Sequence, residues 1–247
     1  MLDILETIRE SSSCLGLPEL ARALCLPRTT VCRIVATLAS RGYLARNPTG
    51  HYLISRKPFD FQQDESEEKA LLRAAQPVMV SLVDSCRETV NLGVLSGDAV
   101  VVISTVQSPQ SIRITSKVGN RLYLHSTAIG KVLLSSLPEK EVQRLVRIQC
   151  LPRLTPRTIV TRQALAAELD LVRRQGFAVD NEENEPYGRC LSAPVVGIGG
   201  RIVAALSISA PTFRMDMAKS RALAAELIEA TNGISRALTL PGLASRS

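Results

Sequence analysis

Two short helical patterns between residues 18 and 40, separated by a tight connection, most constrain how the start of this chain can fold. Pro18 and Glu19 suit the first turn of a helix, because proline lacks only a donor that is unpaired there and an acid complements the positive helix end. Only a tight connection at Cys25 separates this helix from the one that Pro27 begins. Helices joined this closely are typical of a helix-turn-helix unit.

The flanking residues complete a three-helix unit with a hairpin. Leu2, Leu5 and Ile8 recur at helical spacing and predict a first helix. After Gly42, the short strand patterns 43–46 and 51–54 enclose the turn-forming sequence Asn-Pro-Thr-Gly, which predicts a hairpin. Three helices followed by this hairpin predict a winged helix-turn-helix over residues 1–59, with the hairpin as its wing.

The third helix has one apolar face and one short, polar face. The apolar face repeats at the spacing that packs a helix onto a core, through Val31, Ile34, Val35 and Leu38. The opposite face carries Thr29, Arg33, Ala36, Thr37 and Ser40. Because this face has short side chains around one arginine, it can lie close to base edges in the major groove of DNA.

The charge pattern of the same region favours a polyanionic partner. Residues 20–59 contain seven basic side chains and no Asp or Glu, in a chain whose net charge is +7. Arg33 can donate two hydrogen bonds to guanine, and the residues before it can reach phosphates. The predicted contacts to double-stranded operator DNA are Arg28, Thr29, Thr30, Arg33, Thr37 and Ser40 on the helix, and Arg46 and His51 on the wing. The alternative is a unit that contacts only proteins, because a fold does not by itself imply a function.

An acidic stretch, from Asp60 to Glu68, indicates a solvated boundary after this unit. Residues 70–87 then predict a long helix, and residues 88–247 alternate strands with helices as in an α/β or α+β domain. We therefore divide the chain into residues 1–59, a linker with its helix at 60–87, and a second domain at 88–247. The predicted strands of that domain are 90–95, 99–106, 190–196 and 202–209, and its predicted helices are 127–137, 139–147, 162–175 and 215–238.

Cysteine and histidine usage argues against a metal site. The 6 cysteines form no Cys-x-x-Cys pair, and the 2 histidines, His51 and His125, complete no zinc-ligand cluster. This usage indicates a reduced, cytosolic setting without a metal or other cofactor. No apolar run is long enough to cross a membrane, and no basic leader precedes one, so we expect a cytoplasmic protein.

The start of the helix predicted at 127–137 is a candidate anion site. Ser126 or Thr127 can act as its N-cap, and the free backbone N–H groups of a helix N-terminus attract carboxylates. The alternative is that the hydroxyl only caps the helix, which is common.

The chain resembles the IclR family of bacterial transcriptional regulators over nearly its whole length. The resemblance is carried by Leu26-Pro27-Arg28-Thr29-Thr30-Val31-Cys32-Arg33-Ile34, by the stretch from Thr37 to Tyr43, by the stretch from Leu124 to Lys131, and by Gly188-Arg189-Cys190-Leu191-Ser192-Ala193-Pro194-Val195. It implies an α+β protein in which a winged helix-turn-helix is joined by a linker helix to a GAF-like effector-binding domain. It also implies a homodimer or tetramer. The chain departs from the family at Cys25, where a glycine is usual in the helix-turn-helix turn.

The resemblance further implies a small-molecule pocket in the second domain. Carried over by position, its residues are Thr127, Ala128, Ile129, Asp180, Cys190, Ser207 and Ser209, with Ile114 and Leu122 as further apolar wall. Asp180 can accept a hydrogen bond from a ligand hydroxyl, and the two serines can hold a carboxylate. The alternatives are a turn role for Asp180, an inert buried Cys190, and serines that face outward.

The favoured function is a ligand-responsive, DNA-binding regulator of a catabolic operon, with a small carboxylate as effector. A second hypothesis is a thiol-dependent enzyme that uses Cys190, with His125 as its nearest base and the N-terminal unit as a tether. A third makes the N-terminal unit a protein-interaction module.

Overall fold

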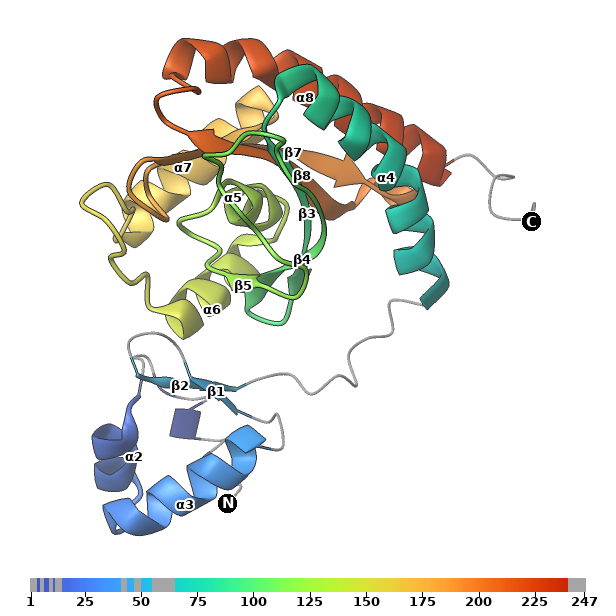
Figure 1. Cartoon of the computed structure of the whole chain (residues 1–247). Coiled ribbons are helices and arrows are strands. Elements are labelled where there is room, and N and C mark those ends of the chain that lie inside the picture. The colour runs from blue at the N-terminus through green and yellow to red at the C-terminus, as the bar shows by residue number, and fades with distance from the viewer. Residues whose placement is uncertain are drawn as a thin grey trace.

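The N-terminal unit has two of the three predicted helices and the hairpin (Figure 1), and most of the first predicted helix, all but residues 4, 7 and 8 of its span, lies outside the described residues. The structure is a computed structural model that describes residues 4, 7, 8, 11, 15–40, 44–46, 50–54 and 65–239. Two helices, α2 (Leu17–Ala23) and α3 (Arg28–Ser40), precede the antiparallel strands β1 (Leu44–Arg46) and β2 (Tyr52–Ile54). The hairpin is confirmed, and the turn predicted at its tip, residues 47–49, lies outside the described residues.

The core of this unit is the predicted apolar stripe. Ile4, Leu20, Val31, Val35 and Leu38 are buried together, each with at most 4% of its surface exposed. The stripe on α3 therefore packs on the preceding helices, as predicted, and leaves the opposite face of α3 toward solvent.

Cys25, in the turn between α2 and α3, has a left-handed backbone with a φ of 51°. Glycine adopts this conformation freely, whereas for a residue with a side chain the left-handed conformation costs about 1 kcal/mol of conformational free energy. The chain therefore keeps the turn that glycine favours while carrying a cysteine in it.

The C-terminal part is built on a single antiparallel sheet with the strand order β5-β4-β3-β8-β7-β6. The strands are β3 (Thr89–Ser96), β4 (Ala99–Val106), β5 (Arg121–Leu122), β6 (Ala178–Asn181), β7 (Gly188–Val196) and β8 (Ile202–Pro211). The predicted pairs β3–β4 and β7–β8 are confirmed, and a short 3-10 turn, η2 (Ile198–Gly200), joins the second pair. The short strands β5 and β6 were not predicted.

Helices cover both faces of the sheet (Figure 1). On one face lie α4 (Glu65–Cys86) and α8 (Met217–Thr239), and on the other lie α5 (Ala128–Ser135), α6 (Glu139–Gln149) and α7 (Arg162–Gln175). Helix α4 begins before residue 70, where its start was predicted. Three of the acids that indicated a boundary, Glu65, Glu67 and Glu68, lie at its start, where negative charge is favourable, and Asp60 and Asp64 lie outside the described residues. The domain limits at residues 59 and 87 stay a prediction.

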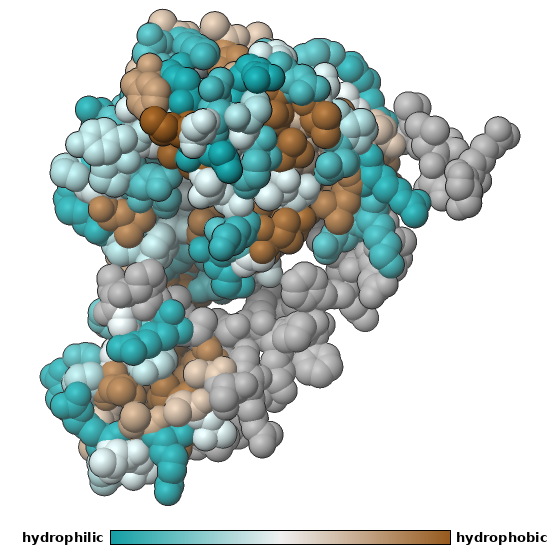
Figure 2. All heavy atoms as spheres, viewed as in Figure 1, coloured by the Kyte–Doolittle hydropathy of each residue, from teal (hydrophilic) through white to brown (hydrophobic). Residues whose placement is uncertain are grey.

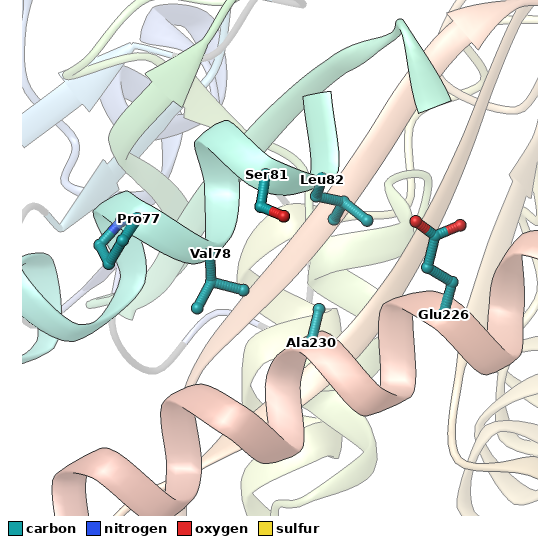
Figure 3. A pocket seen from close by; sticks show the side chains of 6 residues that line it. All are labelled: Pro77, Val78, Ser81, Leu82, Glu226 and Ala230. Atoms are coloured by element: carbon teal, nitrogen blue, oxygen red, sulfur yellow. The ribbon is translucent and has the colours of Figure 1, made fainter. Parts of the chain in front are cut away.

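Helix α4 is attached to the second domain through α8. Ser85 of α4 donates a hydrogen bond to Glu226 of α8, beside a groove of about 340 Å³ between the two helices (Figure 3). Its walls are Pro77, Val78, Ser81, Leu82, Glu226 and Ala230. Figure 2 shows hydrophobic surface among hydrophilic surface over α4, where Val80 is 42% exposed. Helix α4 is therefore packed on the sheet and on α8 in one hydrophobic core.

The start of α5 is pressed against the chain that precedes it. A Cβ atom on Gly130 would lie 2.3 Å from the backbone oxygen of Leu124, which no side chain tolerates. Gly93 of β3 is similarly close to Ile129, at 3.0 Å from a built Cβ to Cγ2. These two glycines let α5 lie close against the sheet.

The cysteines follow the sequence expectation only in part. Cys25, Cys32, Cys86 and Cys190 carry free thiols. Cys150 is disulfide-bonded, so the expectation of reduced cysteines is wrong at that residue. Sequence spacing could not show this, because disulfides join residues that the fold brings together.

Candidate DNA interface and effector site

The exposed face of α3 carries most of the predicted DNA contacts. Arg28, Thr29 and Arg33 are exposed, and Thr30 and Thr37 are half-buried. The hydroxyl of Thr37 donates to the Arg33 carbonyl oxygen at 2.9 Å, so its proton is committed within the helix. The side chain of Ser40 lies outside the described part of the chain. The face thus presents two arginines and short polar side chains to solvent.

The wing carries its two predicted residues beside each other in the hairpin. Arg46 is exposed, its Nε donates to the Gly50 carbonyl oxygen at 3.3 Å, and its guanidinium lies 5.9 Å from the ring centre of Tyr52. His51 is half-buried. These contacts stabilise the hairpin while the Arg46 charge stays in solvent.

A row of polar side chains crosses the sheet on the face under α5. In register, Asp180 of β6 pairs with Cys190 of β7, Cys190 with Ser209 of β8, and Ser209 with Thr89 of β3. The next row toward the other end of the strands is Ser192, Ser207, Asn91 and Thr105. Three of the four strand residues predicted for the pocket thus share one row, and the fourth, Ser207, lies in the adjacent row.

Thr89 and the second-row residues other than Ser207, namely Ser192, Asn91 and Thr105, were not predicted. Thr89 and Asn91 alternate with buried apolar residues on β3, and this polar alternation was the available signal. Asn91 donates to Ser209 Oγ at 3.3 Å and accepts from the Thr105 hydroxyl at 2.8 Å. The hydroxyl of Thr89 donates to the carbonyl oxygen of Ile114 at 2.7 Å, which places the Ile114 backbone beside the row, and the role of its side chain as apolar wall stays a prediction.

The serines face inward. Ser207 and Ser209 are 2% and 3% exposed, so the alternative of outward-facing serines is wrong. The sequence predicted strand β8 correctly, but it did not show which face of this strand α5 covers. The pairing of β8 with β3 and β7 shows that face. Cys190 is half-buried, whereas its neighbours in the row are buried.

The N-terminus of α5 lies over this face. The Thr127 hydroxyl accepts from the Gly130 N–H at 3.1 Å and donates to the Tyr123 carbonyl oxygen at 2.6 Å, so it is the N-cap. The first intrahelical bond is donated by Lys131 to the Thr127 carbonyl oxygen. The N–H groups of Ala128 and Ile129 therefore remain as donors without a partner among the described residues.

Asp180 ends the first row and is 2% exposed. One carboxyl oxygen, Oδ1, accepts from the N–H groups of Glu183 and Asn184, at 2.8 and 3.2 Å. Burial raises the pKa of Asp180 to about 7, and the nearby Glu183 charge adds to the increase. Asp180 thus shapes the turn after β6, as its structural alternative proposed, and also brings a titrating carboxyl to the row.

Cys190 is a poor nucleophile in this setting. Burial raises the pKa of its thiol, and the Asp180 charge raises it further. The predicted base, His125, is fully buried, and its Nε2 lies 3.1 Å from the Pro152 carbonyl oxygen. Burial shifts the pKa of His125 in the opposite direction, downward, because it disfavours the charged imidazolium.

A buried lysine supports the turn after β6, and sequence reasoning missed it. Lys131 of α5 is 0% exposed, and its Nζ lies 2.6 Å from Glu183, 3.0 Å from Glu168 of α7 and 2.8 Å from the Val179 carbonyl oxygen. All three protons of the Lys131 ammonium group are therefore donated in hydrogen bonds. No local pattern separates a lysine buried with acids from one in solvent.

The described residues hold neither a metal cluster nor a spanning helix. Within them, no group of three His, Cys, Asp or Glu side chains is close enough to bind a metal ion. None of the helices in the described part of the chain is both long and apolar enough to cross a bilayer.

A helix-turn-helix head with an exposed polar helix, joined to an α/β domain with a buried polar face, defines a two-domain DNA-binding regulator. Residues 1–48 match the IclR helix-turn-helix domain, and residues 65–236 match the family of bacterial transcriptional regulators described as IclR C-terminal. The chain belongs to the IclR family of transcriptional regulators. It is therefore a ligand-responsive, DNA-binding regulator and not an enzyme, and the comparisons give the thiol-enzyme hypothesis no support.

Relatives and solved structures agree with this assignment. The chain is 35% identical to the HTH-type transcriptional regulator BhcR of Paracoccus denitrificans, over 95% of this chain and 84% of the relative. It is 30% identical to the acetate operon repressor of Salmonella typhimurium, over 96% of this chain and 87% of the relative. The crystal structure of the Thermotoga maritima IclR superposes with a TM-score of 0.67 at 29% identity and covers 97% of both chains.

Proposed function

We propose that this protein reads operator DNA with the exposed face of α3 and uses the β1–β2 hairpin as a wing. The observation that carries this proposal is the polar face of α3, with Arg28, Thr29 and Arg33 exposed opposite a buried apolar stripe. Arg33 lies at the centre of that face and is the candidate for bidentate contact with guanine. Arg46 and His51 of the wing then meet the flanking backbone.

We further propose that the protein binds DNA as a homodimer. One winged helix makes few phosphate contacts, whereas two copies double them and read two half-sites. Helix α4 is the coupling element in this proposal, since it leads from the head and is fixed to α8 by the Ser85–Glu226 hydrogen bond. An effector that changes how the sheet packs under α4 changes the placement of the two heads.

The effector we propose is a small carboxylate, and the regulated genes form a catabolic operon. The free N–H groups of Ala128 and Ile129 form an anion site at the start of α5, facing the row of Asp180, Cys190 and Ser209. The hydroxyl of Thr127 is fully used as the cap, so its role is to orient those N–H groups. The similarity of this chain to the acetate operon repressor of Salmonella typhimurium supports a carboxylate-linked operon for this chain as well.

Replacing Arg33 by alanine is expected to weaken operator binding by about 1 to 3 kcal/mol and to relax the preference at one base position. The reason is the loss of a bidentate contact to one base. Fluorescence anisotropy with the operator, with single-base variants and with random-sequence DNA measures both effects. Equal losses on operator and on random DNA would show that Arg33 contacts phosphate rather than a base.

Effector binding is expected to weaken as the pH rises through about 7. Asp180, whose pKa is raised to about 7, is neutral below that pH and negative above it, where it repels a carboxylate. Calorimetric titration at pH 6 and pH 8 is expected to show a loss of about tenfold, which Asp180→Asn abolishes. Asp170→Asn, on the exposed face of α7, is the matched control and is expected to keep the pH dependence. A parent protein with pH-independent affinity would remove Asp180 from the site.

The coupling between the two domains is tested with acids that demonstrably bind the protein. Operator affinity measured with and without each bound acid is expected to differ for the effector. Equal operator affinity across all of these acids would contradict the regulatory proposal, whether or not the pocket itself is correct.

A further inference from the structure

Four polar side chains form a series of hydrogen bonds that runs from the surface into the sheet, here called the polar relay. It begins at Gln107, which is exposed after β4, and continues through Thr105 of β4 and Asn91 of β3 to Ser209 of β8. Gln107 Nε2 lies 3.3 Å from Thr105 Oγ1, which lies 2.8 Å from Asn91 Oδ1. Asn91 Nδ2 lies 3.3 Å from Ser209 Oγ. Asn91 and Ser209 are 5% and 3% exposed, so the inner end of the polar relay is buried.

The outer end of the polar relay sets the direction of every bond in it. Gln107 Nε2 also lies 2.8 Å from the carbonyl oxygen of Ser116, and because a carbonyl can only accept, the amide nitrogen must be the atom that faces it. The same nitrogen donates to Thr105, whose own proton then goes to Asn91 Oδ1. The amide nitrogen of Asn91 is therefore the atom that donates to Ser209.

Ser209 receives a hydrogen bond from the polar relay and keeps its own proton to donate. Its partner in register on β7 is Cys190, whose sulfur is a weak acceptor. A hydroxyl that accepts a hydrogen bond becomes a stronger donor, because successive bonds polarise one another. Ser209 is thus a donor on the face of the sheet under α5, and the group that matches it is an oxygen without a proton, as in a carboxylate or an oxo group.

We propose that Asn91 is a positioning residue of the effector site, which orients the Ser209 hydroxyl as a donor and so selects a ligand oxygen that carries no proton. Thr105 and Gln107 act through Asn91 by fixing the orientation of its amide. The ligand class is an acid that turns a carboxylate or oxo oxygen toward Ser209, and a ligand that presents an N–H group there is rejected. This inference rests on the proposed effector site under α5.

The first test removes one link of the polar relay without adding a charge. The probe is whichever of acetate, lactate and benzoate binds the full-length parent most tightly in calorimetric titration. Thr105→Val deletes the proton that fixes the Asn91 amide and is expected to weaken binding of the probe by about tenfold. Thr105→Ser keeps a hydroxyl and is expected to restore the parent affinity. Thr115→Val, at an exposed position of the loop after β4, is the matched control and is expected to change nothing. Parent affinity in Thr105→Val, or an equal loss in Thr105→Ser, overturns the inference.

The second test reverses the last bond of the polar relay. Asn91→Asp has nearly the same shape, but its carboxylate only accepts, so Ser209 donates to it and turns its lone pairs toward the ligand. Binding of the probe acid is expected to fall by about tenfold, whereas binding of its primary amide, which can donate to Ser209, is expected to rise by about fivefold. Charge repulsion cannot raise the affinity for a neutral amide. An amide affinity that is unchanged or lowered in a folded variant overturns the inference, and if circular dichroism shows that Asn91→Asp does not fold, the Thr105 variants decide.

The outcomes separate this inference from the function on which it rests. A parent that binds none of the acids contradicts the carboxylate effector and the inference together. A parent whose operator affinity changes with a bound acid, while the Thr105 and Asn91 variants bind that acid as the parent does, keeps the proposed function and overturns the inference alone.

Discussion

Operator affinity is expected to fall by about a thousandfold when the salt concentration is raised from about 50 to about 200 mM. The physical reason is release of the counterions that surround DNA, which follows when roughly six phosphates are neutralised by the protein. The exposed charges of Arg28, Arg33 and Arg46 lie in a region, residues 20–59, that contains no acid. Arg33 is assigned to a base, but residues 20–59 hold six further basic side chains in each head, so roughly six phosphate contacts are within reach of a dimer.

Anisotropy titrations at several salt concentrations give the slope of log affinity against log salt. Arg28→Ala is expected to reduce this slope by about two, because the dimer loses one phosphate contact in each of its two heads. Arg236→Ala is the control, because Arg236 of α8 is exposed and pairs with Glu229 instead. An affinity that does not depend on salt would contradict DNA reading by this face and would favour a protein-contact module.

The replacement Lys131→Met is expected to destabilise the C-terminal domain by about 3 to 5 kcal/mol. Methionine has nearly the length of lysine but leaves the carboxylate of Glu183, 2.6 Å from Nζ in the parent, buried without its cation. Removing one partner of a buried ion pair costs more than the pair contributes, because the remaining charge stays desolvated. Denaturant unfolding followed by circular dichroism measures the loss. Lys140→Met, at an exposed position of α6, is expected to change stability by less than about 0.5 kcal/mol.

The double variant Lys131→Met/Glu183→Gln and the pH dependence test the cause. Glutamine carries no charge, so the double variant is expected to recover part of the stability. Burial already raises the pKa of Glu183, and loss of the lysine raises it further. A carboxyl whose pKa is raised on folding stabilises the folded state less as the pH increases. The defect of Lys131→Met is therefore expected to be smaller at pH 5 than at pH 8, and an equal defect at both would show that packing is the cause.

Most of the elements could be predicted because their patterns are long and local. The stripe of Val31, Val35 and Leu38 specifies α3, and the β-branched runs of β3, β4, β7 and β8 specify those strands. Strands β5 and β6, with 2 and 4 residues, are too short to show a period. The start of α4 was placed too late because acids at residues 65–68 stabilise a helix N-terminus as readily as they mark a boundary.

Without the family resemblance, which supplied Asp180, Cys190, Ser207 and Ser209, the site could be predicted only where neighbours in sequence form it. The cap at Thr127 and the free N–H groups after it are local, and the sequence contains all of that information. The pairing of Asp180 with Cys190 and of Ser209 with Thr89 depends on strand order, which residue types do not specify. Lys131 was missed for the same reason, since its partners Glu168 and Glu183 come from elements far along the chain.

The close contact at Gly130 has a consequence for how such a regulator acquires a new ligand. Since no side chain fits against the Leu124 backbone, the start of α5 cannot move or be rebuilt by substitution at this residue without losing the domain. The end of the pocket that we propose to bind an anion is thus a fixed part of the architecture. Side chains on β3, β6, β7 and β8 face the same space without that restriction. A change of effector is therefore expected to begin on the sheet, while the requirement for an acidic group is retained.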